Sequence, residues 1–358
     1  MEPVRVGIVG CGKVAGLHAA ALRAVPEAMY VGACDSDPGR AAAFAAKHGG
    51  AAFADLDQLL RAGIKVVLIA TPHPAHAAPT VQAAEAGVHV LVEKPMAATL
   101  ADCDAMIAAA ARTGVRLGVI SQRRFYEPVQ RIKAAIDAGK LGTPALGLFL
   151  MYSWRDAAYY TSDPWRGRWD TEGGGVLVNQ SPHQLDLLLW LLGPAAEVTG
   201  FWGNLNHPTV EVDDTAVAAI RFRNGGLGSV LTSVAQKPGI YTKVHVHGSN
   251  GASVGVETDR GATFIAGVSG IAEPPLTDLW TVPGEEHRLA EFQAADRAAF
   301  AGVDGTTHYH ALQIRDFVRA VRDGRKPLVT GEDGRAVVEL FTAIYQSNRE
   351  GRAVQLPR

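Results

Sequence analysis

The sequence predicts an α/β protein of two domains, the first built on a doubly wound parallel sheet and the second on a mostly antiparallel open sheet. The 358 residues correspond to about two domains at a prior of roughly 150 residues each. Up to about residue 122, short apolar strands alternate with helical segments, as in parallel sheets covered on both faces. Beyond it, strands follow one another with glycine-rich turns. We therefore expect domains at residues 1–122 and 123–358.

The elements of the first domain begin with a buried strand at Val4–Val9, followed by a helix over Lys13–Val25 whose apolar residues recur at helical spacing. Pro26 ends that helix. An alanine-rich helix ending at His48 follows the second strand, and we expect Asp37, just before Pro38, to cap it. The later strands are predicted at Tyr30–Cys34, Val66–Ala70, Val88–Val92 and Val115–Ile120.

The second domain opens with a helix near Glu127–Ala138, and one long apolar helix, about Leu177–Leu192, is predicted between its first two strands. The segment Leu276–Thr306 has no clear period and is predicted to be loop with short pieces of helix. Helices at His310–Asp323 and Asp333–Arg349 close the chain. The strands are predicted at Ala145–Tyr152, Ala196–Trp202, Thr215–Arg223, Gly228–Ala235 and Thr242–Gly248.

The composition excludes several classes of protein. Lys and Arg total 34 against 36 Asp and Glu, so no broad basic field for nucleic acid or an anionic membrane is expected. Three cysteines are too few for a disulfide framework or a cysteine-rich zinc site, and a reducing, cytoplasmic location is expected. The chain enters a strand directly after Met1–Pro3, and its apolar runs are short, so neither a signal peptide nor a membrane span is expected.

A dinucleotide-binding loop is predicted at Gly10–Ala15, which fits G-x-G-x-x-A between a strand and a helix. The glycines allow a tight turn and a close approach of backbone to a pyrophosphate, with Lys13 and Val14 opening the helix whose N–H groups hold it. A tight strand–helix turn without a ligand is the alternative. Asp35, at the end of the second strand, is placed to bind the ribose hydroxyls of NAD.

The preference for NAD over NADP depends on Asp35, because its carboxylate would repel a 2′-phosphate. Ser36 and Arg40 would weaken that repulsion. We therefore expect NAD as the cofactor and keep NADP as the second candidate.

A lysine follows a buried strand at Val90–Pro95, where Glu93 and Lys94 form a charged pair before the proline. Ligands of doubly wound sheets bind beyond the carboxyl ends of the strands, which places Lys94 beside a nicotinamide. Partial desolvation there would lower its pKa and suit it to acid–base chemistry. A lysine in a surface turn is the alternative interpretation.

Polar residues on the long apolar helix form a second candidate site. Asn179, His183 and Asp186 stand at i, i+4 and i+7 and would share one helix face. Asp186 lies among leucines and needs a partner, either His183, the backbone or a remote arginine. A satisfied polar histidine without a catalytic role is the alternative for His183.

Aromatic and arginine residues crowd the stretch before the glycine run, where Trp154, Trp165 and Trp169 fall within sixteen residues. Aromatic faces pack on sugar rings and arginines bind hydroxyls, so this stretch predicts a sugar pocket, with a core or subunit interface as the alternative. The expected contributors are Tyr152, Arg155, Tyr159 and Trp165. From the C-terminal part, His308–His310 are expected to reach the same cleft, with His310 the chosen candidate, and no metal site is expected there.

Taken together, these motifs resemble the glucose–fructose oxidoreductase / inositol dehydrogenase / rhizopine-catabolism (Gfo/Idh/MocA) family, and the resemblance spans nearly the whole chain. It implies an N-terminal Rossmann domain and a C-terminal domain whose open sheet often forms an oligomer interface. The motifs that carry it are Gly10–Ala15, Thr71-Pro72 with His76, Glu93–Pro95, Gly173–Asp186 and Gln313–Pro357.

The resemblance also implies roles for single residues. Lys94 and His183 would be the catalytic pair, and Asn179 departs from the aspartate that many members carry at its position. Asparagine does not titrate, so it can hydrogen-bond a sugar hydroxyl but cannot relay a proton. By the same similarity, the residues lining the cofactor would be Thr71, Pro72, His76 and Glu93, with Gln122 and Arg124 near the nicotinamide or the substrate.

The expected function is an NAD(P)-dependent dehydrogenase or reductase acting on a hydroxyl or carbonyl of a sugar, glycoside or cyclitol. An NAD-dependent glycosidase, which oxidises the sugar transiently and returns the hydride, is the alternative. A non-catalytic dinucleotide-binding regulator is a third, against which Lys94 argues. A homodimer or homotetramer is expected, because one face of an open sheet needs covering.

Overall fold

The computed structural model describes residues 2–258, 263–265, 268–270 and 273–357. The chain divides into two compact units. The first unit contains the chain up to Gln122 together with Thr306–Val338, and the second contains Arg123–Gly305 and the chain from Glu339 onward. The assignment of residues 306–338 to the second domain is therefore wrong.

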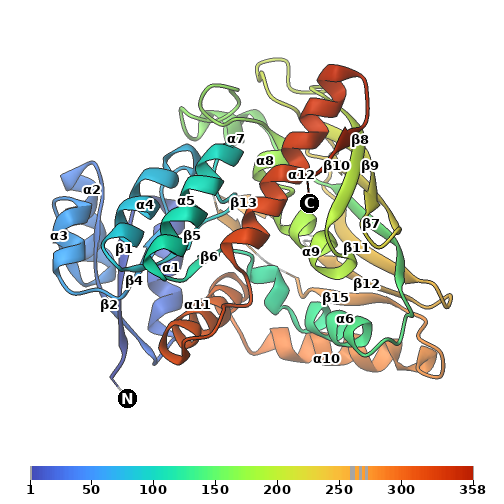
Figure 1. Cartoon of the computed structure of the whole chain (residues 1–358), viewed down its shortest axis with the longest axis horizontal. Coiled ribbons are helices and arrows are strands. Elements are labelled where there is room, and N and C mark those ends of the chain that lie inside the picture. The colour runs from blue at the N-terminus through green and yellow to red at the C-terminus, as the bar shows by residue number, and fades with distance from the viewer. Residues whose placement is uncertain (1, 259–262, 266–267, 271–272, 358) are drawn as a thin grey trace. The chain divides into compact units, whose positions relative to one another are not determined.

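The first unit contains a parallel sheet, as predicted (Figure 1). Its described strands run in the order β3-β2-β1-β4-β5-β6, so the order reverses beside β1, where ligands of such sheets bind. The three-residue strand β3 was not predicted. The strands are β1 Val4–Val9, β2 Ala28–Cys34, β3 Ala51–Phe53, β4 Val66–Ile69, β5 His89–Val92 and β6 Leu117–Val119.

Helices connect these strands, and their ends follow local rules. Asp37 caps α2 as expected, because its Oδ1 accepts from the N–H groups of Gly39 and Arg40. The helices are α1 Lys13–Arg23, α2 Pro38–His48, α3 Leu56–Arg61, α4 Ala77–Glu85, α5 Leu100–Thr113 and α11 Gly305–Asp323, with a 3₁₀ turn η1 His73–Ala75.

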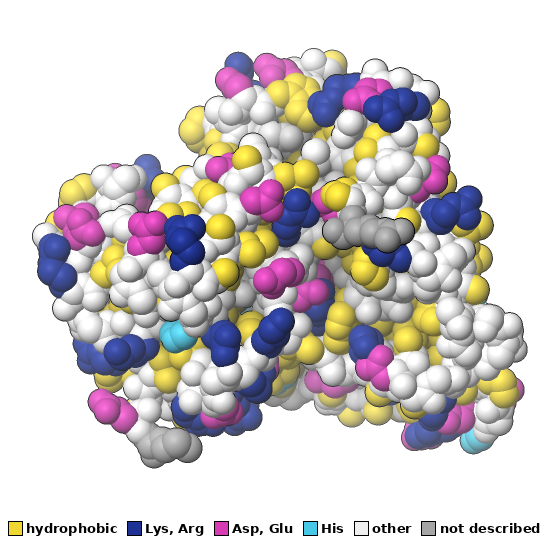
Figure 2. Space-filling model, viewed as in Figure 1, with side chains coloured by type: hydrophobic (Ala, Val, Ile, Leu, Met, Phe, Trp, Pro, Cys, Tyr) yellow, Lys and Arg dark blue, Asp and Glu magenta, His cyan; other side chains and the backbone are white. Residues whose placement is uncertain are grey.

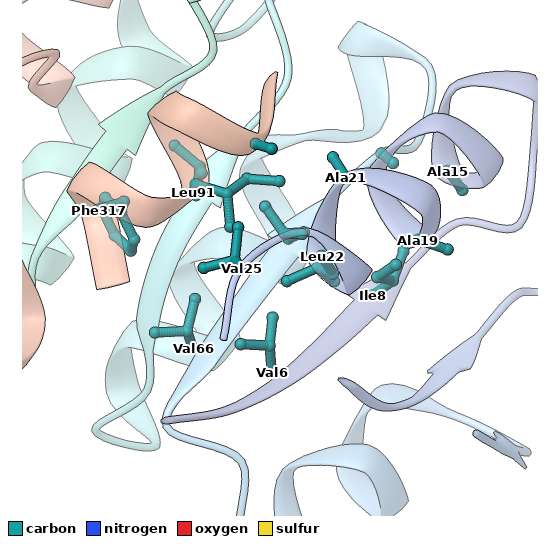
Figure 3. Close-up of a cluster of buried hydrophobic side chains, with 14 of the residues drawn as sticks. Val6, Ile8, Ala15, Ala19, Ala21, Leu22, Val25, Val66, Leu91 and Phe317 are labelled. Atoms are coloured by element: carbon teal, nitrogen blue, oxygen red, sulfur yellow. The ribbon is translucent and has the colours of Figure 1, made fainter. Parts of the chain in front are cut away.

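Helix α11 belongs to the core of the first unit. Figure 3 shows its Phe317 in one cluster with Leu91 and Val25, and Ile314 is buried in the same cluster. Gly118 on β6 allows the close packing, since a Cβ there would lie 2.9 Å from the Phe317 ring. Periodicity predicted the helix correctly, but it says nothing about which domain the apolar face packs against.

The second unit contains a mostly antiparallel sheet, as predicted, in which β7 and β10 form a parallel pair. Its described strands run in the order β15-β12-β11-β7-β10-β9-β8-β16. The strands are β7 Pro144–Tyr152, β8 Ala195–Gly203, β9 Thr215–Phe222, β10 Leu227–Ser233, β11 Tyr241–Gly248, β12 Ser253–Thr258, β15 Leu276–Trp280 and β16 Val354–Gln355, with a separate pair β13 Thr263–Ile265 and β14 Val268–Gly270.

Two predictions for the second unit's helices are wrong. The predicted long helix is two helices, α8 Val176–Asn179 and α9 Pro182–Leu192, because Pro182 has no N–H to donate inside a continuous helix. The predicted loop contains β15 and helix α10 Leu289–Ala301, which buries only Phe292 and Asp296 and so gives a weak periodic signal. The other elements are η2 Gln122–Phe125, α6 Glu127–Asp137, α7 Ala157–Thr161, η3 Glu286–Arg288 and α12 Gly331–Glu350.

One face of the second sheet packs under α9, where Gly147 on β7 leaves room for Leu188 and Leu192. The outward-facing positions carry apolar side chains that stay exposed. Phe201 on β8 is 68% exposed and faces Val217 on β9, and Leu227 on β10 faces Leu146 on β7. We call Leu146, Phe201, Val217 and Leu227 the apolar sheet face.

Charged side chains of both signs are interspersed on the surface shown in Figure 2, in keeping with the formal net charge of −2. Within the part of the chain that the structure describes, no helix is both long enough and apolar enough to cross a membrane.

Candidate active site

The glycine-rich loop joins β1 to α1 with the geometry that a pyrophosphate site needs. Gly10 has φ +89°, and a Cβ there would lie 2.9 Å from the backbone of Ala70, so only glycine fits. A Cβ on Gly12 would meet nothing within 4 Å, which leaves open space above the loop. No side chain caps α1 at Gly12, and Ala15 is fully buried against the sheet. The loop, with Lys13 and Val14 in the first turn of α1, therefore fits a bound phosphate group.

Asp35 lies against this loop, at the end of β2. Its Oδ2 accepts from Cys11 N at 2.8 Å and its Oδ1 from Asp37 N at 2.9 Å. A carboxylate has further acceptor sites on each oxygen, so Asp35 can still bind ribose hydroxyls. Ser36 Oγ also approaches Oδ1, while Arg40 forms an exposed pair with Asp37.

The turn after β4 is held by His76, which is fully buried. Its Nε2 lies 2.8 Å from Thr71 O, and its Nδ1 lies 3.1 Å from Pro95 O. His76 therefore ties the turns after β4 and β5 together, and it has no exposed surface with which to line a cofactor, contrary to the expectation. Pro72, which is exposed, and Thr71, which is half-buried, do have such surface.

Glu93, at the end of β5, is the centre of a buried cluster that the sequence analysis did not predict. Its Oε1 lies 2.8 Å from His18 Nε2, and its Oε2 accepts from Lys94 N at 3.0 Å. Burial alone would raise the pKa of Glu93, but the hydrogen bond from His18 and the nearby His310 and Lys94 lower it to about 2. Glu93 therefore positions the backbone of Lys94 rather than exposing a carboxylate.

His18 and His310 complete this cluster from α1 and α11, with ring centroids 5.7 Å apart. His310 therefore belongs to the first unit, where it lies near Glu93, while the aromatic residues with which it was grouped belong to the second unit. The sequence signal that could have indicated His18 is that it is a histidine within an otherwise apolar stretch of α1.

Gln122 ends the first unit just beyond β6, at the same sheet edge as Lys94. It is buried, and no described residue hydrogen-bonds its Oε1. An acceptor without a partner at the ligand-binding edge fits a cofactor that would donate to it.

In the second unit, Tyr159 joins the predicted aromatic stretch to α8. Its Oη accepts from Arg166 Nη1 and Gln180 Nε2, both at 2.6 Å. Arg166 also stacks on the rings of Tyr159 and Trp165, at 4.4 Å from each centroid. Burial raises the pKa of Tyr159 to about 12, so the phenol stays protonated at neutral pH.

Other predicted sugar-pocket residues lie around or outside this cluster. Arg155 lies 5.5 Å from the Tyr159 ring, and its Nη1 donates to Trp154 O at 2.7 Å. Tyr152 instead packs on Tyr241 of the neighbouring strand β11.

Glu172 is a buried carboxylate in this cluster that the sequence analysis missed. Its Oε1 accepts from Asn179 Nδ2 and its Oε2 from Gly167 N. Burial raises the pKa of Glu172, although these hydrogen bonds and Arg166 oppose the shift.

The glycine run before α8 is held by Asp213, which is fully buried. Its carboxylate accepts from Gly175 N at 2.7 Å, Leu177 N at 3.1 Å and Tyr345 Oη at 2.6 Å. A Cβ on Gly175 would collide with the Asp213 backbone, so the run requires glycine there. Asp213 and Tyr345 thus fix the start of the helix that carries Asn179.

Asp186 on α9 pairs with Arg124, which settles the choice left open for its partner. Arg124 Nε donates to Asp186 Oδ2 at 2.8 Å and Nη2 to Oδ1, with both side chains almost fully buried. Arg124 therefore has a structural role as the partner of Asp186, and its expected contact with cofactor or substrate stays a prediction. His183 precedes Asp186 by one helical turn on α9 and is 9% exposed, whereas Asn179 belongs to the separate helix α8.

The described residues include no group of three or more His, Cys, Asp or Glu side chains arranged to hold a metal ion.

Comparison with known proteins identifies matches over both units. Residues 4–121 match a GFO/IDH/MocA family model described as "Oxidoreductase family, NAD-binding Rossmann fold", and residues 129–254 match a model described as "GFO/IDH/MocA C-terminal domain". These two matches cover most of the chain.

Similar proteins match over nearly their full length. The scyllo-inositol 2-dehydrogenase (NAD(+)) of Bacillus subtilis is 29% identical, with 99% of this chain and 96% of the relative covered. The myo-inositol 2-dehydrogenase of Thermotoga maritima is 26% identical, with 99% and 98% covered. The crystal structure of the WlbA dehydrogenase from Bordetella pertussis with NADH and UDP-GlcNAcA has a TM-score of 0.87 at 29% identity and covers 100% of this chain and 99% of that one.

Proposed function

The chain belongs to the Gfo/Idh/MocA family of oxidoreductases, and from this premise we propose that it oxidises a secondary hydroxyl of a sugar, glycoside or cyclitol, or reduces the corresponding carbonyl. The family match confirms the NAD-binding Rossmann domain predicted from Gly10–Ala15. One observation carries the proposal: the phosphate cradle after β1 and Lys94 after β5 belong to the same carboxyl edge of one parallel sheet.

In the proposed chemistry, the cofactor and a few side chains have separate roles. When bound, NAD⁺ supplies the hydride acceptor. Lys94 Nζ takes the proton of the reacting hydroxyl, with His183 as the second candidate for this step. Asn179 and Arg166 orient the other hydroxyls of the substrate. In the reverse direction, the same groups supply the proton to the carbonyl oxygen.

A substrate panel tests this proposal. Purified protein is mixed with NAD⁺ and glucosides, inositols and anhydrosugars, and absorbance of the reduced nicotinamide is followed. A sustained rise with one member supports the dehydrogenase. Cleavage of a glycoside without that rise supports the redox-neutral glycosidase, to which the two inositol dehydrogenases named above give no support. No reaction with any member rejects the proposal.

The cofactor preference depends on Asp35. Replacing it with serine is expected to raise the ratio of kcat/KM for NADP⁺ to that for NAD⁺ by about 10-fold or more, since a like charge beside the 2′-phosphate is removed. Asp35→Asn is the matched control, because it keeps the shape and one acceptor for Cys11 N while also losing the charge. An unchanged ratio in both variants would remove Asp35 from the ribose site.

We also propose that a second copy of the chain covers the apolar sheet face, giving a homodimer or, with a further interface, a homotetramer. Four exposed apolar side chains form two cross-strand pairs on one face of neighbouring strands, and exposed apolar surface gathered on one face is typical of an interface. Phe201→Glu is expected to shift the mass measured by light scattering toward the monomer. Thr199→Glu, at the next outward position on β8, tests the same face with a smaller loss of apolar surface and should shift the mass less. A monomeric wild-type protein would contradict the proposal.

A further inference from the structure

Glu172 and Asn179 form a pair that the proposed chemistry does not yet use. Glu172 is 1% exposed, whereas Asn179, at the last residue of α8, is only partly buried. One carboxylate oxygen accepts from Asn179 Nδ2 and the other from Gly167 N. A buried carboxylate needs hydrogen-bond donors. Here each oxygen of the Glu172 carboxylate has one, so the carboxylate is held from both sides.

The chemistry of this pair permits one orientation of the Asn179 amide. An ionised carboxylate only accepts hydrogen bonds, so it must face the NH₂ group, and the side-chain carbonyl must then point away from Glu172. An asparagine with neutral polar neighbours can exchange its oxygen and nitrogen by rotation of the amide, but beside Glu172 this rotation would bring two acceptors together.

The surroundings make the orientation rigid. Asp213 and Tyr345 hold the glycine run at the start of α8, and the next residue after Asn179 donates to Tyr159 Oη. Among the charged groups that act on Glu172 are Arg166, which lowers the pKa of its carboxyl group, and Asp213, which raises it. Asn179 therefore has a fixed backbone, a fixed amide and a partly exposed face.

We propose that Glu172 is a positioning residue, which holds the side-chain carbonyl of Asn179 as an acceptor for a substrate hydroxyl. The inference rests on the proposed function, since it assigns the hydroxyl to a sugar or cyclitol. It also explains why a carboxamide can serve at position 179. With negative charge already carried by Glu172 and, nearby, by Asp213, an uncharged acceptor at position 179 keeps a further carboxylate away from Glu172.

Four proteins test this: wild type, Glu172→Gln, Asn179→Asp and the reciprocal double variant Glu172→Gln/Asn179→Asp. The first readout is the melting temperature between pH 5 and pH 8, which needs no substrate. In Asn179→Asp two carboxyl groups face each other, so one folded-state pKa is raised above its unfolded value. The stability that this group contributes is present at low pH and lost as pH rises through the folded pKa.

The melting temperature of Asn179→Asp is therefore expected to fall relative to wild type by on the order of 5 °C between pH 5 and pH 8. The double variant should lose this pH dependence, because amide and carboxylate have only exchanged places. If Glu172 only filled space, neither the single variant nor the double variant should differ from wild type in the pH dependence of its melting temperature. The same pH dependence in the single and double variants would overturn the pairing.

The second readout is steady-state kinetics with a substrate from the panel. In Glu172→Gln the amide of Asn179 is no longer held in one orientation, so the KM for the sugar should rise about 3- to 10-fold while the KM for NAD⁺ stays within 2-fold. The double variant should recover most of the sugar KM. An unchanged sugar KM in Glu172→Gln would overturn the positioning role. A panel without any substrate would instead reject the proposed function, while the melting series still decides the pairing.

Discussion

Replacing Lys94 with methionine is expected to lower kcat by about 10²- to 10⁴-fold, the usual contribution of a general acid–base group. Methionine keeps the length of the side chain but cannot carry the proton of the reacting hydroxyl. Glu93, which binds the Lys94 backbone, and the phosphate cradle at Gly10–Ala15 are left unaltered. The dissociation constant for NADH, measured by fluorescence titration, should therefore stay close to that of wild type.

Two further variants make this result specific. Lys94→Arg keeps a positive charge but cannot lose its proton at neutral pH, so it should be nearly as inactive as the methionine variant. His183→Asn tests the second candidate for the same proton. Near-full turnover by Lys94→Met together with an inactive His183→Asn would transfer the proton step to His183, whereas full activity of both would reject the proposed pair.

Breaking the buried pair of Arg124 and Asp186 should have the largest effect on stability. Arg124→Met leaves the Asp186 carboxylate buried without its bidentate partner, which typically costs about 3–5 kcal/mol in the free energy of unfolding. For a unit of this size the melting temperature should fall by roughly 6–20 °C. Calorimetry of the purified protein measures both quantities.

Two controls separate the loss of a buried partner from the loss of a charge. The double variant Arg124→Met/Asp186→Leu removes both charges and should recover much of the stability, because no uncompensated carboxylate remains. Arg112→Met breaks the ion pair with Glu85, in which both side chains are about 60% exposed. This change should barely alter the melting temperature. A stable Arg124→Met single variant would contradict the structural role assigned to the pair.

Most of the first unit could be predicted from local sequence patterns. The strands from Val4 to Val119, the glycine loop and the Asp37 cap depend on residues close together in sequence, where propensity and periodicity act directly. The second unit was predicted less completely, because the break before Pro182 lies inside an otherwise continuous apolar run and α10 buries only two residues.

The side-chain pairs could not be predicted from such patterns. Asp186 and Arg124 are 62 residues apart, and Glu93 and His18 are 75 residues apart. A sequence shows that a charged residue in an apolar run needs a partner, but several residues can meet that need. Glu172 illustrates the limit, because nothing near it in the sequence marks it as buried or as bound to Asn179.

The first unit is discontinuous along the chain, and this affects the order in which it is completed during synthesis. Helix α11, with Ile314 and Phe317, belongs to a core whose other strands and helices end before residue 122. At a translation rate of about 5–20 residues per second, that core would wait roughly 10–40 s for its last helix. During this interval the apolar surface that Phe317 covers stays open to water or to chaperones. The interval before α11 is synthesised is therefore a stage at which this core is open to aggregation.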